Sequence, residues 1–160
     1  MSSAKRYVPT LFDRLRDDHP HQLTDVAEKR LCSLSDYKAG IVRDLEILVN
    51  TRQCLINLDS IQYPCLSGSL LEYGMPDFTT RGVLNPEDRQ LVQAQLERAI
   101  TIGDGRFKEV RVRLLEQKIG HRMLTFRVDA SLRIHDAKRK VTFDAVLEVN
   151  TQEYKVQNLT

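Results

Sequence analysis

A carboxylate and a guanidinium stand close together in the segment Asp104-Gly105-Arg106. An arginine can grip a carboxylate through two parallel hydrogen bonds in a planar fork, which makes this pairing one of the stronger polar contacts in proteins. The carboxylate held by Arg106 is either that of Asp104 or one supplied by another protein. The spacing alone favours the local pair at a solvated corner, with the contact to another protein as the alternative.

The histidines are the next residues that could do chemistry, as metal ligands or as acids and bases. His19 and His21 have one residue between them but no evident third ligand, so we interpret them as solvated loop histidines. His121 and His135 lie at the ends of predicted strands. No Gly-rich phosphate loop, nucleophile elbow or marked pair of carboxylates accompanies them. The sequence therefore indicates a protein that is not an enzyme and uses no metal, cofactor or small-molecule substrate.

Length and composition are typical of one globular domain. A chain of 160 residues can bury a core, and 41% hydrophobic with 29% charged residues argues against disorder. The formal net charge of +2 is too small to indicate a nucleic acid or a membrane surface as the partner.

The cysteines and the N-terminus indicate the compartment. Cys32, Cys54 and Cys65 are odd in number and lack the spacing of a zinc site or a disulfide framework, which favours reduced thiols. The first residues lack a signal-peptide core, and no apolar run reaches the roughly 18 residues of a membrane span. We expect a cytoplasmic protein without membrane insertion.

Residues 1–30 are polar and are interrupted by Pro9 and Pro20, which predicts an N-terminal arm with a short docking helix. Leu11, Phe12 and Leu15 would lie on one side of a single helical turn. From this pattern alone, docking on the protein's own body is slightly favoured over docking on a partner. Residues 31–160 are predicted to form one domain.

Two longer helices are predicted in that domain. The first runs from about Ser35 to Arg52 behind a Ser35-Asp36 start, and the second opens at Asn85 with Asn85 as its cap. Between them, prolines and glycines rule out a long regular element. Gly103 and Gly105 are expected to end the second helix and turn the chain, through backbone angles that only glycine adopts freely.

From Phe107 the apolar period changes from 3.6 to 2, which indicates strands. Three apolar alternations, over 110–114, 124–134 and 141–149, are separated by predicted turns at "QKIGH" and "HDAKRK". They predict an antiparallel meander of three strands, with a fourth left open, whose apolar face is covered by the two helices. The predicted fold class is α+β.

Arginines occupy the expected polar faces of these strands, at Arg111, Arg113, Arg127 and Arg133. A nucleic-acid surface would interleave aromatic side chains with them, and none is present on that face. A solvated face or an acidic protein partner is the favoured interpretation.

Four stretches occur in the order found in the TssE family of type VI secretion baseplate subunits, and the chain resembles that family over nearly its whole length. They are "LFDRL" (11–15), "DLEILVNTR" (44–52), "SLLEYGMPDF" (69–78) and the corner Asp104-Gly105-Arg106. This family is similar to the tailed-phage baseplate wedge proteins, which carry the name lysozyme-like.

The resemblance implies a structural role, as a wedge component that joins the baseplate to the first ring of the contractile sheath. It also implies partner-binding residues within these stretches, namely Leu11, Phe12, Arg14, Leu15, Arg52, Asp104, Gly105 and Arg106. In the family the corner is typically Glu-Pro-Arg. Here Asp104 stands for the glutamate, Gly105 replaces the proline, and Arg106 matches. The implied partners are other wedge subunits and sheath proteins. They are expected to bind at the open edges of the sheet and at the corner arginine.

Two functions from other classes stay open. The second hypothesis is a regulatory adaptor that binds a response-regulator-like protein, because the same fold family includes a small inhibitor of a protease-delivery factor. A peptidoglycan hydrolase is the third reading and rests on the family's name alone.

Overall fold

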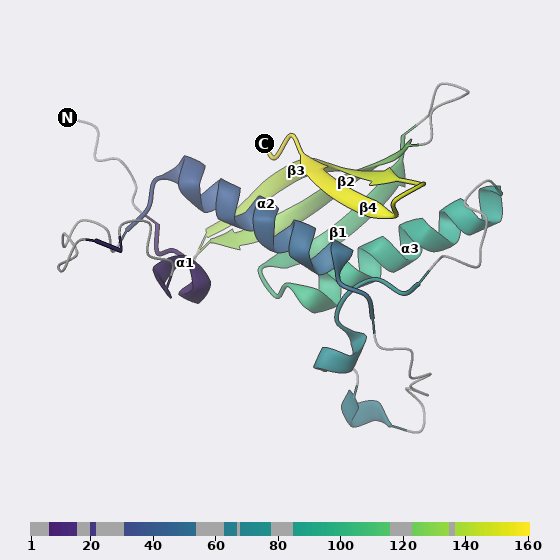
Figure 1. The fold of residues 1–160 in the computed structure, drawn as a ribbon, viewed down its shortest axis with the longest axis horizontal. Coiled ribbons are helices and arrows are strands. Elements are labelled where there is room, and N and C mark those ends of the chain that lie inside the picture. Colours follow the sequence, from purple (N-terminus) through teal and green to yellow (C-terminus); the bar gives the residue numbers. More distant parts are fainter. Residues whose placement is uncertain are drawn as a thin grey trace. The chain divides into compact units, whose positions relative to one another are not determined.

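The chain forms helices in its first two thirds and strands in its last third (Figure 1). This computed structural model describes residues 7–15, 20–21, 31–53, 63–66, 68–77, 85–115, 123–134 and 137–160. The helical elements are α1 (Leu11–Leu15), α2 (Leu34–Asn50), the short 3-10 helices η2 (Pro64–Leu66) and η3 (Leu70–Glu72), and α3 (Pro86–Gly103). The strands are β1 (Phe107–Leu114), β2 (Met123–Ile134), β3 (Ala137–Glu148) and β4 (Glu153–Gln157). The predictions for His19, Cys54, His121 and His135 lie outside the described residues.

The strands form one antiparallel sheet in the order β1-β2-β3-β4. The predicted α+β class and the meander are therefore confirmed, and the strand left open in the sequence is β4. Alternate residues of β2 and β3 are buried on one face, as the period of 2 predicts. The large buried side chains include Phe107, Phe126, Phe143 and Tyr154.

An irregularity in β1 explains a spacing that the alternation alone does not. Phe107 and Val110 are both buried although they are three positions apart, and two residues so spaced cannot share a face of a regular strand. The pairing with β2 shifts between Lys108 and Arg111, and Glu109 has a φ of 55°. This β-bulge absorbs one extra residue and returns Val110 to the apolar face.

Two predicted strand limits were wrong. Residues 137–140 were assigned to a turn, but they belong to β3, where Lys138 pairs with Arg133 and Lys140 pairs with Ser131. All four residues are exposed, although Ala137 is paired with the buried Ile134 and Arg139 with the buried Leu132. At the other end, Val149 was expected in the strand, but β3 stops at Glu148 and a turn follows.

The helix starts follow capping rules, with two corrections. α2 begins at Leu34, one residue before the predicted start near Ser35, and its cap is Ser33 rather than Ser35. The Asp36 amide donates to Ser33 Oγ and the Ser33 amide donates to Asp36 Oδ2, which makes a reciprocal capping box. For α3, Asn85 does occupy the cap position before Pro86, but its side chain makes no capping hydrogen bond.

The explanation given for the glycines at the end of α3 was also wrong. Neither Gly103 nor Gly105 has a positive φ, and the cap residue Asp104 is extended. Gly103 is needed for space instead, since a Cβ there would lie 2.3 Å from the buried Leu48 Cδ1. The described glycines with a left-handed backbone are Gly68, with a φ of +74°, and Gly74, with a φ of +97°.

The chain divides into two compact units, Met1–Asp44 and Leu45–Thr160, and the boundary falls within α2. In the first unit, Tyr7 exchanges backbone hydrogen bonds with Cys32, and its ring stacks on that of Tyr37. In the second, α3 packs beside β1, as Figure 1 shows. None of the described helices has the length and apolar character to cross a membrane.

Candidate partner-binding site

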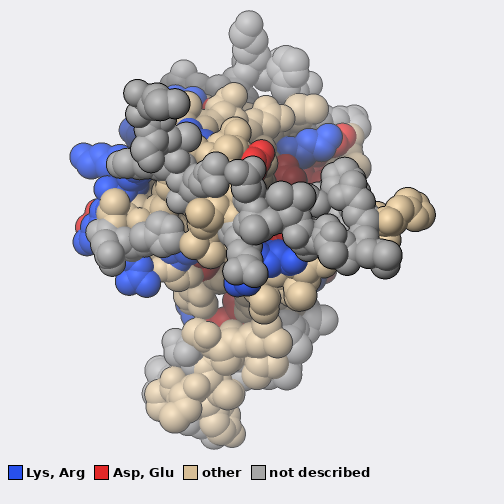
Figure 2. Space-filling model, turned by 90° about the vertical axis from the view of Figure 1, so that its left-hand side faces the viewer, with Lys and Arg blue, Asp and Glu red and all other residues tan. Residues whose placement is uncertain are grey.

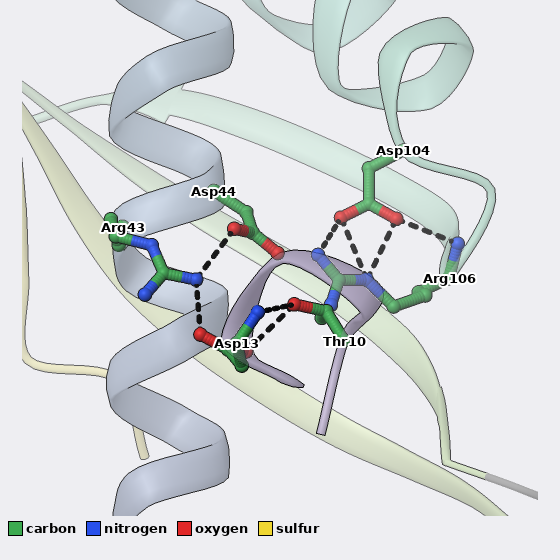
Figure 3. A network of polar contacts seen from close by, with 6 residues as sticks. All are labelled: Thr10, Asp13, Arg43, Asp44, Asp104 and Arg106. Carbon is green, nitrogen blue, oxygen red and sulfur yellow. Dashed lines mark hydrogen bonds and ion pairs between the residues drawn. The ribbon is translucent and has the colours of Figure 1, made fainter. Parts of the chain in front are cut away.

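The corner between α3 and β1 holds the pair that its spacing favours. Arg106 Nε donates to Asp104 Oδ1 at 2.9 Å and Nη2 donates to Asp104 Oδ2 at 2.6 Å, while the Arg106 amide also donates to Oδ1 (Figure 3). The side chains are 24% and 14% exposed, respectively. The corner is therefore a partly buried ion pair that fixes the plane of the guanidinium.

Helix α1 presents apolar side chains to solvent within the first unit. The exposed fractions of Leu11, Phe12 and Leu15 are 67%, 79% and 70%, and Arg14 is exposed as well. α1 has no buried residue, so the body of its own unit does not cover it. An exposed apolar cluster of this kind marks a surface that can bind another protein.

Polar contacts hold α1 in shape. The Asp13 amide donates to Thr10 Oγ1 at the start of the helix, and the Thr10 hydroxyl donates to Asp13 Oδ2. Arg43 of α2 donates to Asp13 Oδ1 at 2.6 Å and reaches Asp44 at 3.3 Å (Figure 3). Burial acts to raise the pKa of Asp13, but the hydrogen bonds from Thr10 and Arg43 outweigh it and leave the pKa lowered. The Asp13 carboxylate therefore ties a single helical turn to α2.

Arg52 lies away from the corner contacts. Its guanidinium donates to Gln152 Oε1 at 2.9 Å, and its backbone forms a parallel bridge with Met75. Arg52 lines a concavity of about 530 Å³, together with Glu46, Asn50 and residues 151–155. Burial raises the pKa of the Tyr154 phenol, whose oxygen has no hydrogen-bond partner among the described residues.

Side chains of α2 cover the outer edge of β4. Asn50 Oδ1 accepts a hydrogen bond from the Tyr154 amide at 2.8 Å, and Asn50 Nδ2 donates to the Tyr154 carbonyl at 2.9 Å. Glu46 Oε1 accepts from the Val156 amide at 3.0 Å. These side chains occupy the backbone groups that a further strand would pair with.

The outer edge of β1 is covered in the same way by α3. Gln93 Nε2 donates to the Val112 carbonyl at 2.8 Å, and Glu97 Oε2 accepts from the Val112 amide at 3.0 Å. Both helices thus use polar residues four positions apart, which project from one side of a helix. Each edge of the sheet is closed at its centre by side chains that imitate a neighbouring strand.

The polar face of the sheet carries a ladder of ion pairs that the sequence did not reveal. Arg127 Nε donates to Asp144 Oδ1 at 2.9 Å, and Arg113 pairs with Asp129. Hydrogen bonding by Arg127 is the main cause of a lowered pKa for Asp144, and hydrogen bonding by Thr142, then Arg113, lowers the pKa of Asp129. Arg111 and Arg113 are exposed, as expected from the alternation.

Within the second unit, the contacts of Arg52 are separate from those of the corner pair. Asp104 and Arg106 contact each other with Gly105 between them, Arg52 contacts Gln152, and the residues of α1 belong to the other unit. Sequence reasoning missed the residues that close the edges. Their signal was a polar pair spaced by four beside the apolar stripe of each helix, at Glu46 and Asn50 and at Gln93 and Glu97. Among the residues that the structure describes, no group of three or more His, Cys, Asp or Glu lies where it could hold a metal ion.

Comparison with protein families identifies one match. Residues 35–137, more than half of the 160-residue chain, match the family described as baseplate wedge protein gp25. Searches of curated proteins and of solved structures gave no match. The matched span runs from the first turn of α2 to the first residue of β3 and includes the corner at Asp104–Arg106.

Proposed function

The chain belongs to the baseplate wedge protein gp25 family, and from this membership we propose that it is a TssE-type structural subunit of a type VI secretion baseplate. In this role it joins the baseplate wedge to the first ring of the contractile sheath and works in the bacterial cytoplasm without catalysing a reaction. Its partners are other wedge subunits and sheath proteins. The family match over 35–137 is the observation that carries the proposal.

The corner is the first proposed contact. Asp104 holds the Arg106 guanidinium in a fixed plane, so a carboxylate of a neighbouring subunit meets a donor that is already oriented. The Asp-Gly-Arg corner differs physically from the Glu-Pro-Arg corner that is typical of the TssE family. The aspartate side chain is one methylene shorter than that of glutamate. Glycine in place of proline makes the unfolded chain more flexible, which lowers the free energy of unfolding by about 0.4–1 kcal/mol where the folded conformation suits proline.

The sheet edge beside this corner is the second proposed contact. The Arg133 amide donates to the Arg106 carbonyl at 2.8 Å, so the β1 ladder continues into the corner. A strand from a sheath protein that pairs along β1 meets the Val112 backbone groups, which Gln93 and Glu97 now occupy. Binding at this edge therefore requires the two side chains to leave Val112.

Helix α1 is the third proposed contact. We assign residues 1–30 to an arm that docks through its short helix on another wedge subunit, and residues 31–160 to the wedge domain. The exposure of Leu11, Phe12 and Leu15 supports docking on a partner more than docking on the body of the same unit.

A co-purification from native cell lysate tests the assembly role. Tagged wild-type protein is compared with Arg106→Glu and with Arg111→Glu, which makes the same charge change at an exposed position of β1. We expect the wild type and Arg111→Glu to recover sheath and baseplate proteins, read by mass spectrometry. Arg106→Glu should lose a subset of them while circular dichroism shows that it is folded. If Arg106→Glu unfolds, Arg106→Gln replaces it, because glutamine adds no second negative charge beside Asp104.

Other outcomes decide against parts of the proposal. Equal recovery by Arg106→Glu and the wild type would remove the corner contact but keep the assembly role. If the wild type recovers no baseplate protein, or only a response-regulator-like protein, the assembly role is wrong and the adaptor function takes its place.

A further inference from the structure

Positive side chains gather at the end of the sheet where β2 passes into β3. Arg133 of β2 is paired directly opposite Lys138 of β3, and the next row across the polar face is Lys108–Ser131–Lys140. The four cations of these two rows are exposed, and the small Ser131 between the lysines is buried. We call this set, Lys108, Arg133, Lys138 and Lys140, the hairpin-end patch. Figure 2 shows Lys and Arg side chains gathered on the left of the view with little red between them.

Farther along the strands, charged residues of the same face form ion pairs with one another. There Arg127 pairs with Asp144 and Arg113 pairs with Asp129. In the two rows of the patch, no acidic residue lies among the described positions, and none of the four cations has an ion pair within the described residues. Among the described residues, ion pairs therefore neutralise the inner part of the face and none neutralises the hairpin end.

Fold stability does not account for this arrangement. Like charges placed directly opposite on neighbouring strands destabilise a sheet, and Arg133 opposite Lys138 is such a pair. Lysines often protect edge strands from unwanted pairing, but β2 and β3 are the two central strands of this sheet. Only Lys108 lies on an edge strand. The repulsion is offset when an anionic partner binds across the patch.

We propose that the hairpin-end patch binds an acidic segment of another protein. An extended segment rich in Asp and Glu fits because Lys108 and Lys140 are two strand spacings apart, about 10 Å, and Ser131 leaves room between them. A nucleic acid fits less well. The phenylalanines of these strands, Phe107, Phe126 and Phe143, are buried on the opposite face and offer no ring for a base to stack on. The patch adjoins the corner, because the Arg133 amide donates to the Arg106 carbonyl, but the proposed binding does not depend on the sheath contact.

Binding of a fluorescein-labelled poly-glutamate peptide, measured by fluorescence anisotropy at low salt, tests this assignment. Wild-type protein is compared with Lys138→Glu and with Lys155→Glu. Lys155 is also exposed and is paired with Val146 of β3, so Lys155→Glu makes the same change in net charge outside the patch. We expect Lys138→Glu to weaken binding about three- to tenfold and Lys155→Glu to change it less than twofold. Binding should also weaken as the salt concentration rises.

Three results would overturn the assignment. The first is no binding of the peptide to the wild type at low salt. The second is an equal loss in Lys138→Glu and Lys155→Glu, which would show a response to net charge alone. The third is tighter binding of a DNA duplex than of the peptide, with the same loss in Lys138→Glu. Thermal melting of each variant ensures that only folded protein is compared.

Discussion

Asp144 combines burial with charge, and this makes it the most consequential polar residue of the sheet. The residue is 8% exposed, yet its carboxylate accepts hydrogen bonds from Arg127 and from Asn158. A buried carboxylate without partners would cost several kcal/mol, so these donors are what permit its position. Because they favour the charged form, the pKa of Asp144 is lowered in the folded protein.

The lowered pKa of Asp144 predicts a loss of stability in acid. Its folded pKa lies below the unfolded value of about 3.9, so its contribution is fully present above about pH 4 and is lost as the pH falls through the folded pKa. Urea unfolding should show Asp144→Asn less stable than the wild type near neutral pH, by about 1–2 kcal/mol. The two free energies of unfolding should converge toward pH 2. A constant difference across the range would contradict the prediction.

Gly74 is the residue whose backbone most restricts substitution. Its φ is +97°, and a Cβ would lie 2.3 Å from the Thr51 carbonyl oxygen, a backbone atom that cannot move aside as a side chain would. We expect Gly74→Ala to lower the free energy of unfolding by about 1–3 kcal/mol. Gly105→Ala is the matched control, since no atom lies within 4 Å of its Cβ position and its φ is not positive. It should be neutral or slightly stabilising in the same urea titration.

At the scale of elements, the covered edges decide how the sheet meets a partner. The Tyr154 amide bonds to Asn50, so by the antiparallel alternation the next amide, that of Lys155, points toward β3. Asn50→Ala should therefore speed hydrogen exchange at the Tyr154 amide by about five- to tenfold, while Lys155 exchanges as in the wild type. Nuclear magnetic resonance resolves the two amides. An equal increase at both would indicate a loosened β4 rather than an opened edge.

The period of the apolar residues was enough to predict the class, the two longer helices and the meander, because burial of one face is a local property of each element. It could not place the hydrogen bonds that join elements far apart in sequence. Asn50 and Tyr154 are 104 residues apart, and only the packed fold brings them together. The β-bulge at Glu109 was also hidden, since a single extra residue looks like an ordinary break in alternation.

The candidate site was predicted only where it is local. Arg106 and Asp104 are close in sequence, so their pairing followed from spacing and chemistry. The separation of Arg52 from that pair, and its contact with Gln152, depended on the fold. The charged end of the hairpin was missed because residues 137–140 were assigned to a turn, where three consecutive charged residues need no explanation.

At the scale of the whole molecule, the surfaces proposed for binding differ in chemistry. Helix α1 offers apolar side chains, the corner offers an oriented guanidinium, and the hairpin-end patch offers four cations. One partner rarely suits such different surfaces. A subunit at a junction between several proteins needs separate surfaces of this kind, and that need is consistent with a place in a baseplate wedge.

Helix α1 provides the test of this view at the level of assembly. Phe12 is 79% exposed, so Phe12→Ser should change the free energy of unfolding by no more than about 0.5 kcal/mol. If α1 docks on another wedge subunit, the same variant should lose that subunit in co-purification, because a buried aromatic anchor carries a large share of interface energy. Leu70→Ser is the control, since Leu70 is 85% exposed and lies in η3 of the other unit. Equal losses in both variants would mean that exposed apolar residues bind without specificity. If only Phe12→Ser loses the wedge subunit and still recovers the sheath proteins, α1 binds the wedge subunit and the second unit binds the sheath.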